Sequence, residues 1–259
     1  MVYLLQDITQ FLHDFQTFYQ NSMLSYTEEN YLKTIFLLSY SISNDNHKDN
    51  HKDNLPETKE ISTNDIAIKI DISAASVTDM LKKLSKKELI KYTKYHGVSL
   101  TEIGETFAVE IIRRHRLWET FLVVKLNFNW SEIHDIAEQL EHISSPKLIE
   151  KLDAFLNYPR FDPHGEPIPD ANGKLYSTDA TPMQQFKKGD KVKVIAVGED
   201  SSLFLEYLDK LNVNIGTEIQ IIDKISYDLS MQIIIDNQVV AISKNVSEKI
   251  YVKTSYKQY

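Results

Sequence analysis

Residues 113–142 read RRHRLWETFLVVKLNFNWSEIHDIAEQLEH, and the rest of the chain is organised around this stretch. Apolar residues recur at helical spacing on both sides of a short break at 127–131, which predicts helices over about 105–125 and 131–142. On the first helix, His115 and Glu119 are four residues apart and therefore share one face. The second helix carries the same residue types on one face, namely His134, Glu138, Glu141 and His142.

A stripe of histidine and glutamate beside an apolar stripe must be ligated, paired or solvated, because an unpaired buried charge is costly. Neutral imidazole and carboxylate without thiolate suit a divalent ion of the Mn, Fe, Co and Zn series. Each residue taken singly is more typical of a solvated or hydrogen-bonded surface group. The spacing on two consecutive helices favours metal binding enough that both interpretations stay open at this point.

Length and composition limit the class of protein. A chain of 259 residues is expected to form two or three domains. It has no cysteine, which excludes disulfides and thiolate metal sites and fits a reducing compartment. No apolar run reaches the ~18 residues of a membrane span. No Lys or Arg precedes Lys33, so the N-terminus is unlike a secretory signal. We expect a cytoplasmic protein that does not enter a membrane.

The N-terminal stretch has two candidate helices and a polar loop. Residues 1–22 form an amphipathic pattern that either packs on the body or a partner, or is an upstream extension before Met23. From Ser25 or Thr27 a second helix is predicted, with acidic residues in its first turn. Residues 43–58 contain a tandem HKDN repeat, for which a flexible loop is favoured over metal binding by its histidines.

Residues 61–101 predict a winged helix. A short helix over 63–70, a tight turn at 71–73 and a helix over 74–87 form a helix-turn-helix. A hairpin follows, over 90–94 and 98–101. The net charge of the chain is −8, yet residues 80–100 contain six lysines and one acid. Such a local basic patch is the electrostatic footprint of DNA binding, and the alternative is a solvated lysine face on an ordinary helical hairpin.

The second helix of this motif begins with small hydroxyl and methyl residues, which allow close approach to base edges and phosphates. Lysines supply backbone contacts further along. The candidate DNA-contacting residues are Thr27, Thr63, Asn64, Ser73, Ala75, Ser76, Thr78, Lys83 and Lys86.

In the C-terminal third of the chain, the spacing of apolar residues changes from a helical period to a period of two. A further helix is predicted from Ser144, and a proline-rich, turn-forming passage follows at 159–169, in which we assign His164 a structural role. From Phe186 the apolar period is two, with one helix at about 202–211. Short strands are predicted over 191–197, 218–222, 231–235, 239–242 and 250–252, a pattern that favours a small SH3-like barrel.

The fold class is therefore mainly α with a small β domain. We expect an N-terminal extension over 1–22, a winged-helix DNA-binding domain over 23–104 and a helical domain over 105–172. A linker over 173–185 precedes the SH3-like domain over 186–259.

Several of these stretches together resemble a known family. They are ENYLKTIF from Glu29, SAASVTDMLKKL from Ser73, RRHRLWETFL from Arg113, the HxxxExxEH run from His134 and FDPHGEPIP from Phe161. Over about residues 25–255 the chain is similar to the metal-dependent transcriptional repressors of the diphtheria-toxin-repressor and manganese-transport-regulator type. The resemblance implies a winged helix, a helical metal-binding and dimerisation domain, and an SH3-like (FeoA-like) domain.

The resemblance also implies metal ligands. The family's primary site falls on Asn30, Glu138, Glu141 and His142. Its ancillary site falls on His115, Glu119 and His134, with Asp200 as a contributor from the barrel. Iron-type members have methionine and cysteine where this chain has Asn30 and Glu138, and an oxygen-rich set suits Mn²⁺, with Fe²⁺ as the alternative. Manganese-type members often have aspartate at position 30 and, in shorter forms, glutamate at position 33, where this chain has Asn30 and Lys33.

By resemblance, the ion is a corepressor that orders a homodimer to bind palindromic operators of metal-uptake genes. The competing classes are a winged-helix regulator that senses an organic ligand, a metal-dependent enzyme and a barrel-bearing adaptor for a metal transporter. The motifs Glu-x-x-His and H-E-x-x-H, which di-metal oxygenases and zinc hydrolases need, are absent around the histidines of the stripe. We therefore expect a regulator rather than an enzyme.

Overall fold

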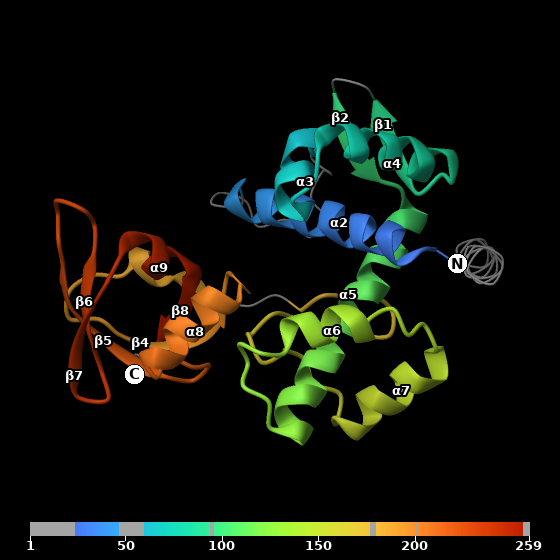
Figure 1. Ribbon diagram of the computed structural model, residues 1–259. Coiled ribbons are helices and arrows are strands. Elements are labelled where there is room, and N and C mark those ends of the chain that lie inside the picture. The colour runs from blue at the N-terminus through green and yellow to red at the C-terminus, as the bar shows by residue number, and fades with distance from the viewer. Residues whose placement is uncertain (1–23, 47–59, 94–95, 177–179, 200, 256–259) are drawn as a thin grey trace, which may run out of the picture. The chain divides into compact units, whose positions relative to one another are not determined.

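Figure 1 shows the computed structural model of the chain, in which residues 24–46, 60–93, 96–176, 180–199 and 201–255 are described. These fall into two compact units, Met1–Ile111 and Ile112–Tyr259, which are treated separately here. The helix expected over 1–22, the histidines of the HKDN repeat and Asp200 lie outside the described residues.

The first unit begins with α2, Tyr26–Asn46. Ser25 caps it, because its hydroxyl accepts the Glu28 N–H at 3.3 Å while the Glu28 carboxylate accepts the Ser25 N–H at 2.8 Å. This reciprocal pair is a capping box, and it confirms the predicted start of the helix. Tyr31, Leu32 and Ile35 form the buried face.

The predicted helix-turn-helix is confirmed as α3, Thr63–Ile70, and α4, Ala74–Lys86. Ser62 and Ser73 are the N-caps, and each accepts a backbone N–H three residues on. Asp71 ends α3 in the left-handed conformation, which aspartate tolerates better than most residues. The inward face of α4 is fully buried, as predicted, through Val77, Leu81 and Leu84.

The wing is an antiparallel hairpin of β1, Ile90–Thr93, and β2, Gly97–Leu100. Thr101 then caps α5, Glu102–Leu126, by accepting the Gly104 N–H at 3.1 Å. The helix begins three residues earlier than the predicted 105. Gly104 lies against the wing, where a Cβ would sit 1.9 Å from the Leu89 carbonyl oxygen.

The second unit contains a helical part, residues 112–176, and a β domain, residues 181–254. In the helical part, α5 packs through Leu117 against α7, Pro146–Phe155, and through Leu122 against α6, His134–Leu140. The second helix of the stripe is thus shorter than predicted. Residues 129–132 form a turn instead, in which Glu132 N–H donates to the Asn129 carbonyl.

The β domain is a six-stranded antiparallel sheet in the order β3-β8-β4-β5-β6-β7. The strands are β3 Thr181–Pro182, β4 Lys191–Val197, β5 Glu218–Lys224, β6 Met231–Ile235, β7 Gln238–Ile242 and β8 Ile250–Thr254. Between them lie η1 Met183–Gln185, α8 Ser202–Lys210 and α9 Lys244–Lys249. All the predicted strands are present. β3 lies inside the segment expected as a linker. It pairs with β8 and forms one edge strand of the sheet.

In the described part of the chain, no helix combines the length and the apolar character required to cross a membrane.

Candidate metal centre and nucleic-acid interface

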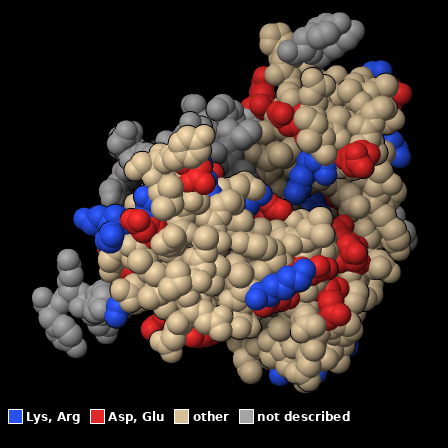
Figure 2. Space-filling view, turned by 60° about the vertical axis from the view of Figure 1, so that its left-hand side comes forward, with Lys and Arg blue, Asp and Glu red and all other residues tan. Residues whose placement is uncertain are grey.

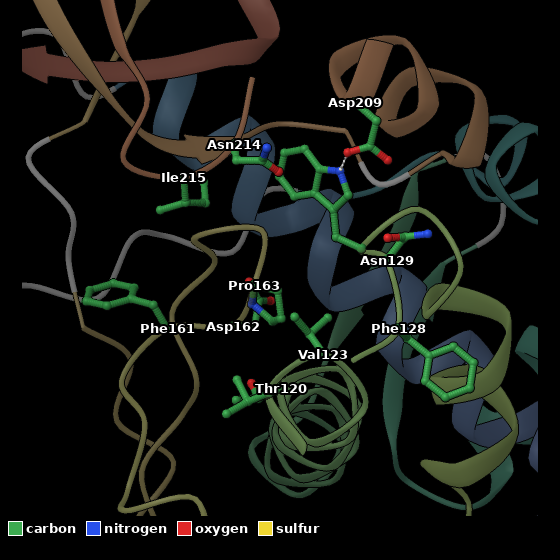
Figure 3. A pocket seen from close by; sticks show the side chains of 12 residues that line it. Thr120, Val123, Phe128, Asn129, Phe161, Asp162, Pro163, Asp209, Asn214 and Ile215 are labelled. Atoms are coloured by element: carbon green, nitrogen blue, oxygen red, sulfur yellow. Dashed lines mark hydrogen bonds between the residues drawn. The ribbon is translucent and has the colours of Figure 1, made fainter. Parts of the chain in front are cut away.

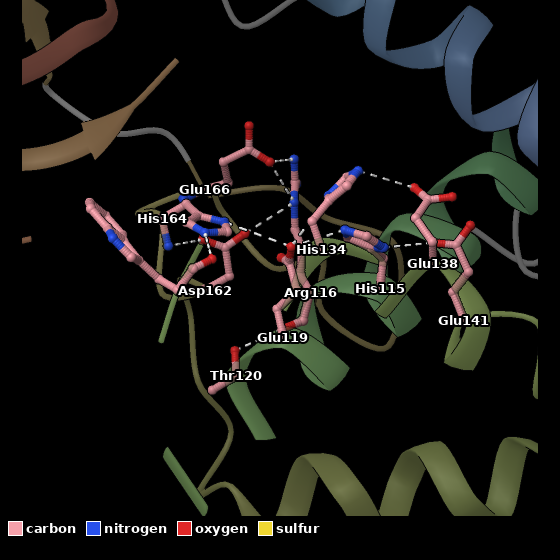
Figure 4. A network of polar contacts seen from close by, with 11 residues as sticks. His115, Arg116, Glu119, Thr120, His134, Glu138, Glu141, Asp162, His164 and Glu166 are labelled. Carbon is pink, nitrogen blue, oxygen red and sulfur yellow. Dashed lines mark hydrogen bonds and ion pairs between the residues drawn. The ribbon is translucent and has the colours of Figure 1, made fainter. Parts of the chain in front are cut away.

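Side chains of the second unit form three groups whose ligand atoms lie within 4.8 Å of one another. Two share an imidazole and are called here the His115 centre: His115 with Glu119 and His134, and His115 with Glu138 and Glu141. The third, called the His164 group, joins Glu119, Asp162 and His164. Figure 4 shows these residues converging from α5, α6 and the loop after α7.

The His115 ring lies between two buried carboxylates. Its Nδ1 is 2.6 Å from Glu141 Oε2, and its Nε2 is 3.1 Å from Glu119 Oε1. Glu119 is one turn along α5, so helical spacing alone brings it to the ring. Glu141 is the residue directly after α6 and is fully buried. The predicted sharing of one face by His115 and Glu119 is therefore confirmed.

α6 adds two further donor groups to this centre. His134 Nδ1 is 3.9 Å from Glu119 Oε1, and His134 Nε2 is 3.8 Å from Glu138 Oε1. The two imidazoles meet edge to face, with ring centroids 5.3 Å apart. Distances of this size leave room for an ion between the donor atoms, because metal–ligand bonds to nitrogen and oxygen are about 2.0–2.2 Å long.

The His164 group was not predicted as a site. The assigned structural role is present, since the His164 N–H donates to Asp162 Oδ1 at 2.8 Å and shapes the turn. The ring, however, is buried, and its Nδ1 lies 3.7 Å from Glu119 Oε1. The only signal in the sequence was the Asp-x-His spacing. Glu119 and His164 are 45 positions apart in the sequence, and no local pattern indicates that they are close in space.

The surroundings shift the pKa values of the two carboxyl groups of the His164 group in opposite directions. Burial favours the neutral form of Glu119, but the imidazoles of His115, His134 and His164 lower its pKa well below the usual value. Burial, reinforced by the charges of Glu119 and Glu166, raises the pKa of Asp162 well above the usual value. The pKa values of these two carboxyl groups are therefore displaced in opposite directions, as is typical of acids that lie close together.

The donor set is chemically consistent. Every group consists of imidazole nitrogen and carboxylate oxygen, and the chain has no cysteine. Such donors suit Mn²⁺, Fe²⁺, Co²⁺ or Zn²⁺, and the high share of oxygen favours the harder ions.

In the first unit, four of the residues predicted to contact DNA lie at the start of α4, whereas Lys83 and Lys86 lie in its last turn. Ser73, Ala75 and Ser76 are exposed, and the Ser73 hydroxyl is 2.9 Å from the Ser76 hydroxyl. Thr78 is half-buried and donates its hydroxyl hydrogen to the Ala74 carbonyl. The N-terminus of α4 therefore presents small polar side chains to the outside, as a helix that enters a groove requires.

The lysine patch is less basic than its local count indicates. Glu28 of α2 lies 2.8 Å from the Lys87 ammonium and 3.3 Å from that of Lys83, and its own side chain is only 2% exposed. Lys82 pairs with Asp79 of the same helix. Figure 2 shows one face of the molecule, on which Lys and Arg lie singly or in small groups among acidic side chains.

Comparison with known proteins assigns the three segments. Residues 53–98 match the family described as iron dependent repressor, N-terminal DNA binding domain, and residues 101–170 match its metal binding and dimerisation domain. Residues 181–254 match the FeoA domain. The solved structure of the manganese regulator SloR is 31% identical, with a TM-score of 0.68 over 88% of this chain and 98% of that chain. The chain belongs to the iron-dependent repressor family.

Other members of the family are also regulators. A manganese-dependent transcriptional repressor solved in complex with manganese is 28% identical, with a TM-score of 0.73 over 88% of this chain and 99% of that chain. The iron-dependent repressor IdeR of Mycobacterium tuberculosis is 33% identical over 104 residues, which are 40% of this chain and 45% of IdeR.

The curated matches cover short stretches. The chain spans less than half the length of IdeR. It covers 19% of a probable metal transport system membrane protein of Chlamydia trachomatis, with 42% identity over 86 residues, 33% of this chain.

The resemblance to this family implies two separate metal sites, a primary and an ancillary one, but in the structure residues of the two sets contact each other. The His115 ring, assigned to the ancillary set, contacts Glu141 of the primary set. His142 is half-buried in the turn after α6 and belongs to none of the three groups found among the described residues. Asn30 belongs to the first unit, and its Oδ1 is buried without a hydrogen-bond partner among the described residues, as a ligand atom would be.

Proposed function

We propose that this protein is a metal-dependent transcriptional repressor that binds operator DNA as a homodimer when a divalent ion is bound. The observation that supports this most is the meeting of His115 with Glu119 and Glu141 in a buried centre. Adjacent carboxylates repel each other, and a cation offsets both that repulsion and the cost of their burial. The exposed start of α4 supplies the DNA-binding side.

We propose Mn²⁺ as the physiological ion, with Fe²⁺ as the alternative. Asn30 and Glu138 offer oxygen where a thioether and a thiolate would favour a softer ion. The bound ion supplies positive charge and directed coordination. The proposed ligands are Asn30, Glu138, Glu141 and His142 in one site, and His115, Glu119, His134 and Asp200 in the other, to which the His164 group adds Asp162 and His164.

Residues of this chain would couple the binding of the ion to the binding of DNA. Asn30 lies on α2, so coordination that includes Asn30 and the residues around α6 would tie the winged helix to the dimerisation domain. The ion shifts the population only if it binds the DNA-competent arrangement more tightly than the other. Two-fold symmetry would then present two α4 helices about one turn of DNA (~34 Å) apart to a palindromic operator.

Residues in and around α4 would make two kinds of contact with the DNA. The proposed contacts are Thr27, Thr63, Asn64, Ser73, Ala75, Ser76, Thr78, Lys83 and Lys86. Those near the start of α4 would read base edges and phosphates, whereas Lys83, Lys86 and Thr27 would contact the DNA backbone. We further propose that the targets are metal-uptake genes and that the protein is located in the cytoplasm. The proposed domain boundaries are 23–104, 105–172 and 186–259, and β3, Thr181–Pro182, adds an edge strand to the last domain.

Fluorescence anisotropy on DNA from upstream of the chain's own gene tests the proposal. The full chain is titrated onto this DNA with Mn²⁺, Fe²⁺, Zn²⁺ or EDTA, and onto a scrambled duplex as control. We expect Mn²⁺ to tighten binding at least about tenfold, as coupling between sites of this kind typically does, and EDTA to reverse it. Equal binding in EDTA would refute metal control and favour a winged-helix regulator that senses a non-metal ligand.

A further inference from the structure

Trp130 belongs by sequence to the helical part but by packing to the β domain. It lies in the turn between α5 and α6, yet the residue is only 6% exposed and belongs to a cluster that contains Phe204, Leu205 and Leu208 of α8. Its indole N–H donates to Asp209 Oδ1, and the neighbouring Ser131 hydroxyl donates to Asp209 Oδ2 at 3.1 Å. Figure 3 labels Asp209 and draws its hydrogen bond to the indole as a dashed line. One carboxylate of the β domain therefore holds two consecutive residues of the turn.

The same turn also holds a member of the His164 group. His164 Nε2 is 3.2 Å from the Trp130 carbonyl oxygen, and the two rings lie 5.7 Å apart. Because a carbonyl only accepts, Nε2 must carry the hydrogen, and the lone pair of a neutral ring is left on Nδ1. Nδ1 is the atom that faces Glu119. The Trp130 backbone thus orients His164 in the way that outer hydrogen bonds orient metal-ligating histidines.

The β domain contacts the His164 turn a second time, through β4. The Val197 N–H donates to the His164 carbonyl at 2.9 Å. Gly165 has φ +84°, and a Cβ there would lie 2.1 Å from the Ile195 carbonyl oxygen. The backbone of the turn and that of β4 are therefore closer than any other residue type at position 165 would allow.

The contacts between the helical part and the β domain do not close the whole space between them. An open cleft of about 490 Å³ borders them and is lined by Thr120, Val123 and Phe161 of the helical part and by Asn214 and Ile215 of the β domain. The two parts are thus incompletely closed against each other, and relative motion is expected of domains that share a limited interface. The described contacts that hold the β domain here are the packing of Trp130, the two hydrogen bonds to Asp209 and the Val197–His164 hydrogen bond.

We propose that Asp209 is a positioning residue for His164, acting through Trp130, so that docking of the β domain and ion binding at the His164 group are one coupled equilibrium. The inference rests on the proposed function, because it needs an ion at Glu119, Asp162 and His164. It assigns the β domain a role that requires no ligand atom from it. By reciprocity, the ion tightens docking by the same factor by which docking tightens the ion.

The first test measures Mn²⁺ binding to the full chain by calorimetry. The variants are His164→Ala, which removes the ligand, Asp209→Ala, and Glu206→Ala as control, an exposed carboxylate one turn earlier on α8. We expect His164→Ala to lose one binding event and Asp209→Ala to weaken the same event about tenfold, as loss of an outer-sphere partner does. Glu206→Ala should bind as the wild type does. Asp209→Asn, which keeps an acceptor for the indole, should recover most of the affinity.

The second test measures docking directly. The chain has two tryptophans, so Trp118→Phe leaves Trp130 as the single reporter. Acrylamide quenching of Trp130 is measured with and without Zn²⁺, an ion that lacks the paramagnetic quenching of Mn²⁺. We expect Zn²⁺ to reduce the quenching constant in this background and the reduction to be lost when Asp209→Ala or Gly165→Ala is added.

The outcomes are distinguishable. If His164→Ala binds Mn²⁺ as the wild type does, no ion binds at the His164 group, and both that part of the proposed function and the coupling are refuted. If His164→Ala loses the event but Asp209→Ala retains full affinity, the site is real and the coupling is wrong. An Asp209→Ala variant could also lose both Mn²⁺ affinity and thermal stability while Zn²⁺ still reduces the acrylamide quenching of Trp130. That result would show a merely structural contact and also refute the proposal.

Discussion

The Glu28 carboxylate lies 2.8 Å from the Lys87 ammonium and 3.3 Å from the Lys83 ammonium, so the first turn of α2 is fastened to the end of α4. The same carboxylate completes the capping box with Ser25. A single buried acid thus holds together the helix that carries Asn30 and the helix that carries the proposed DNA contacts. The charge and position of Glu28 are therefore expected to matter both for the stability of the first unit and for its binding of DNA.

Glu28 makes the stability of the first unit depend on pH in the acid range. Burial favours its neutral form, but Lys87, the Ser25 N–H and Lys83 outweigh burial and lower its pKa from 4.5 to about 2. A lowered pKa contributes stability above the unfolded value, which is lost as pH falls from about 4.5 through about 2. The contribution is at most about 3 kcal/mol. Urea unfolding of wild type and Glu28→Gln should therefore differ at pH 6 and converge toward pH 2. A difference that stays constant with pH contradicts this account.

Lys83 is the lysine of this cluster best placed to reach a phosphate. It is more exposed than Lys87, 55% against 32%, and it is the more distant partner of Glu28. Lys83→Ala should weaken binding to operator and scrambled DNA alike and reduce the slope of log K against log salt by about one. Lys188→Ala, an exposed lysine of the β domain, serves as the control. An unchanged slope would rule out the phosphate contact.

The sequence predicts this fold well where a local signal decides the structure. Ser62, Asp71 and Ser73 mark the boundaries of α3 and α4, and the helix-turn-helix is predicted to within a residue because caps and turns act over three or four positions. The period-two runs locate β4 and β6 at their observed bounds for the same reason.

Residues distant in sequence are where prediction fails. The count of lysines in 80–100 misses Glu28, which lies more than fifty positions earlier and neutralises part of the patch. The sequence predicts only a turn role for His164, because no periodicity links a proline-rich loop to α5. His115 and Glu119 were paired correctly, since helical spacing alone brings them together. The site is therefore predictable where one helix builds it and not where a loop completes it.

Gly104 joins the wing to α5 and tolerates no side chain. A Cβ at this position would lie 1.9 Å from the Leu89 carbonyl oxygen, which is backbone and cannot swing aside. Gly104→Ala should lower the free energy of unfolding by about 1–3 kcal/mol, the usual cost of overpacking, although alanine is the better helix former. Glu102→Ala, at an exposed position two residues earlier, is the control and should change stability little. Thermal unfolding followed by circular dichroism measures both, and equal melting temperatures would contradict the close approach.

Glu141 links α6 to the His115 ring and is the residue whose charge the proposed metal response most needs. It is fully buried, and its Oε2 lies 2.6 Å from His115 Nδ1. Glu141→Gln keeps the shape and one hydrogen-bonding oxygen but removes the charge, so the fold should persist while affinity for Mn²⁺ falls at least about tenfold. Operator binding should then no longer respond to Mn²⁺ at concentrations that saturate the wild type.

The control for net charge is Glu150→Gln, which changes an exposed carboxylate of α7 and should leave the Mn²⁺ response intact. Circular dichroism verifies the fold, and anisotropy with and without EDTA measures the response. A Glu141→Gln variant with an unaltered Mn²⁺ response would remove this residue from the proposed metal centre.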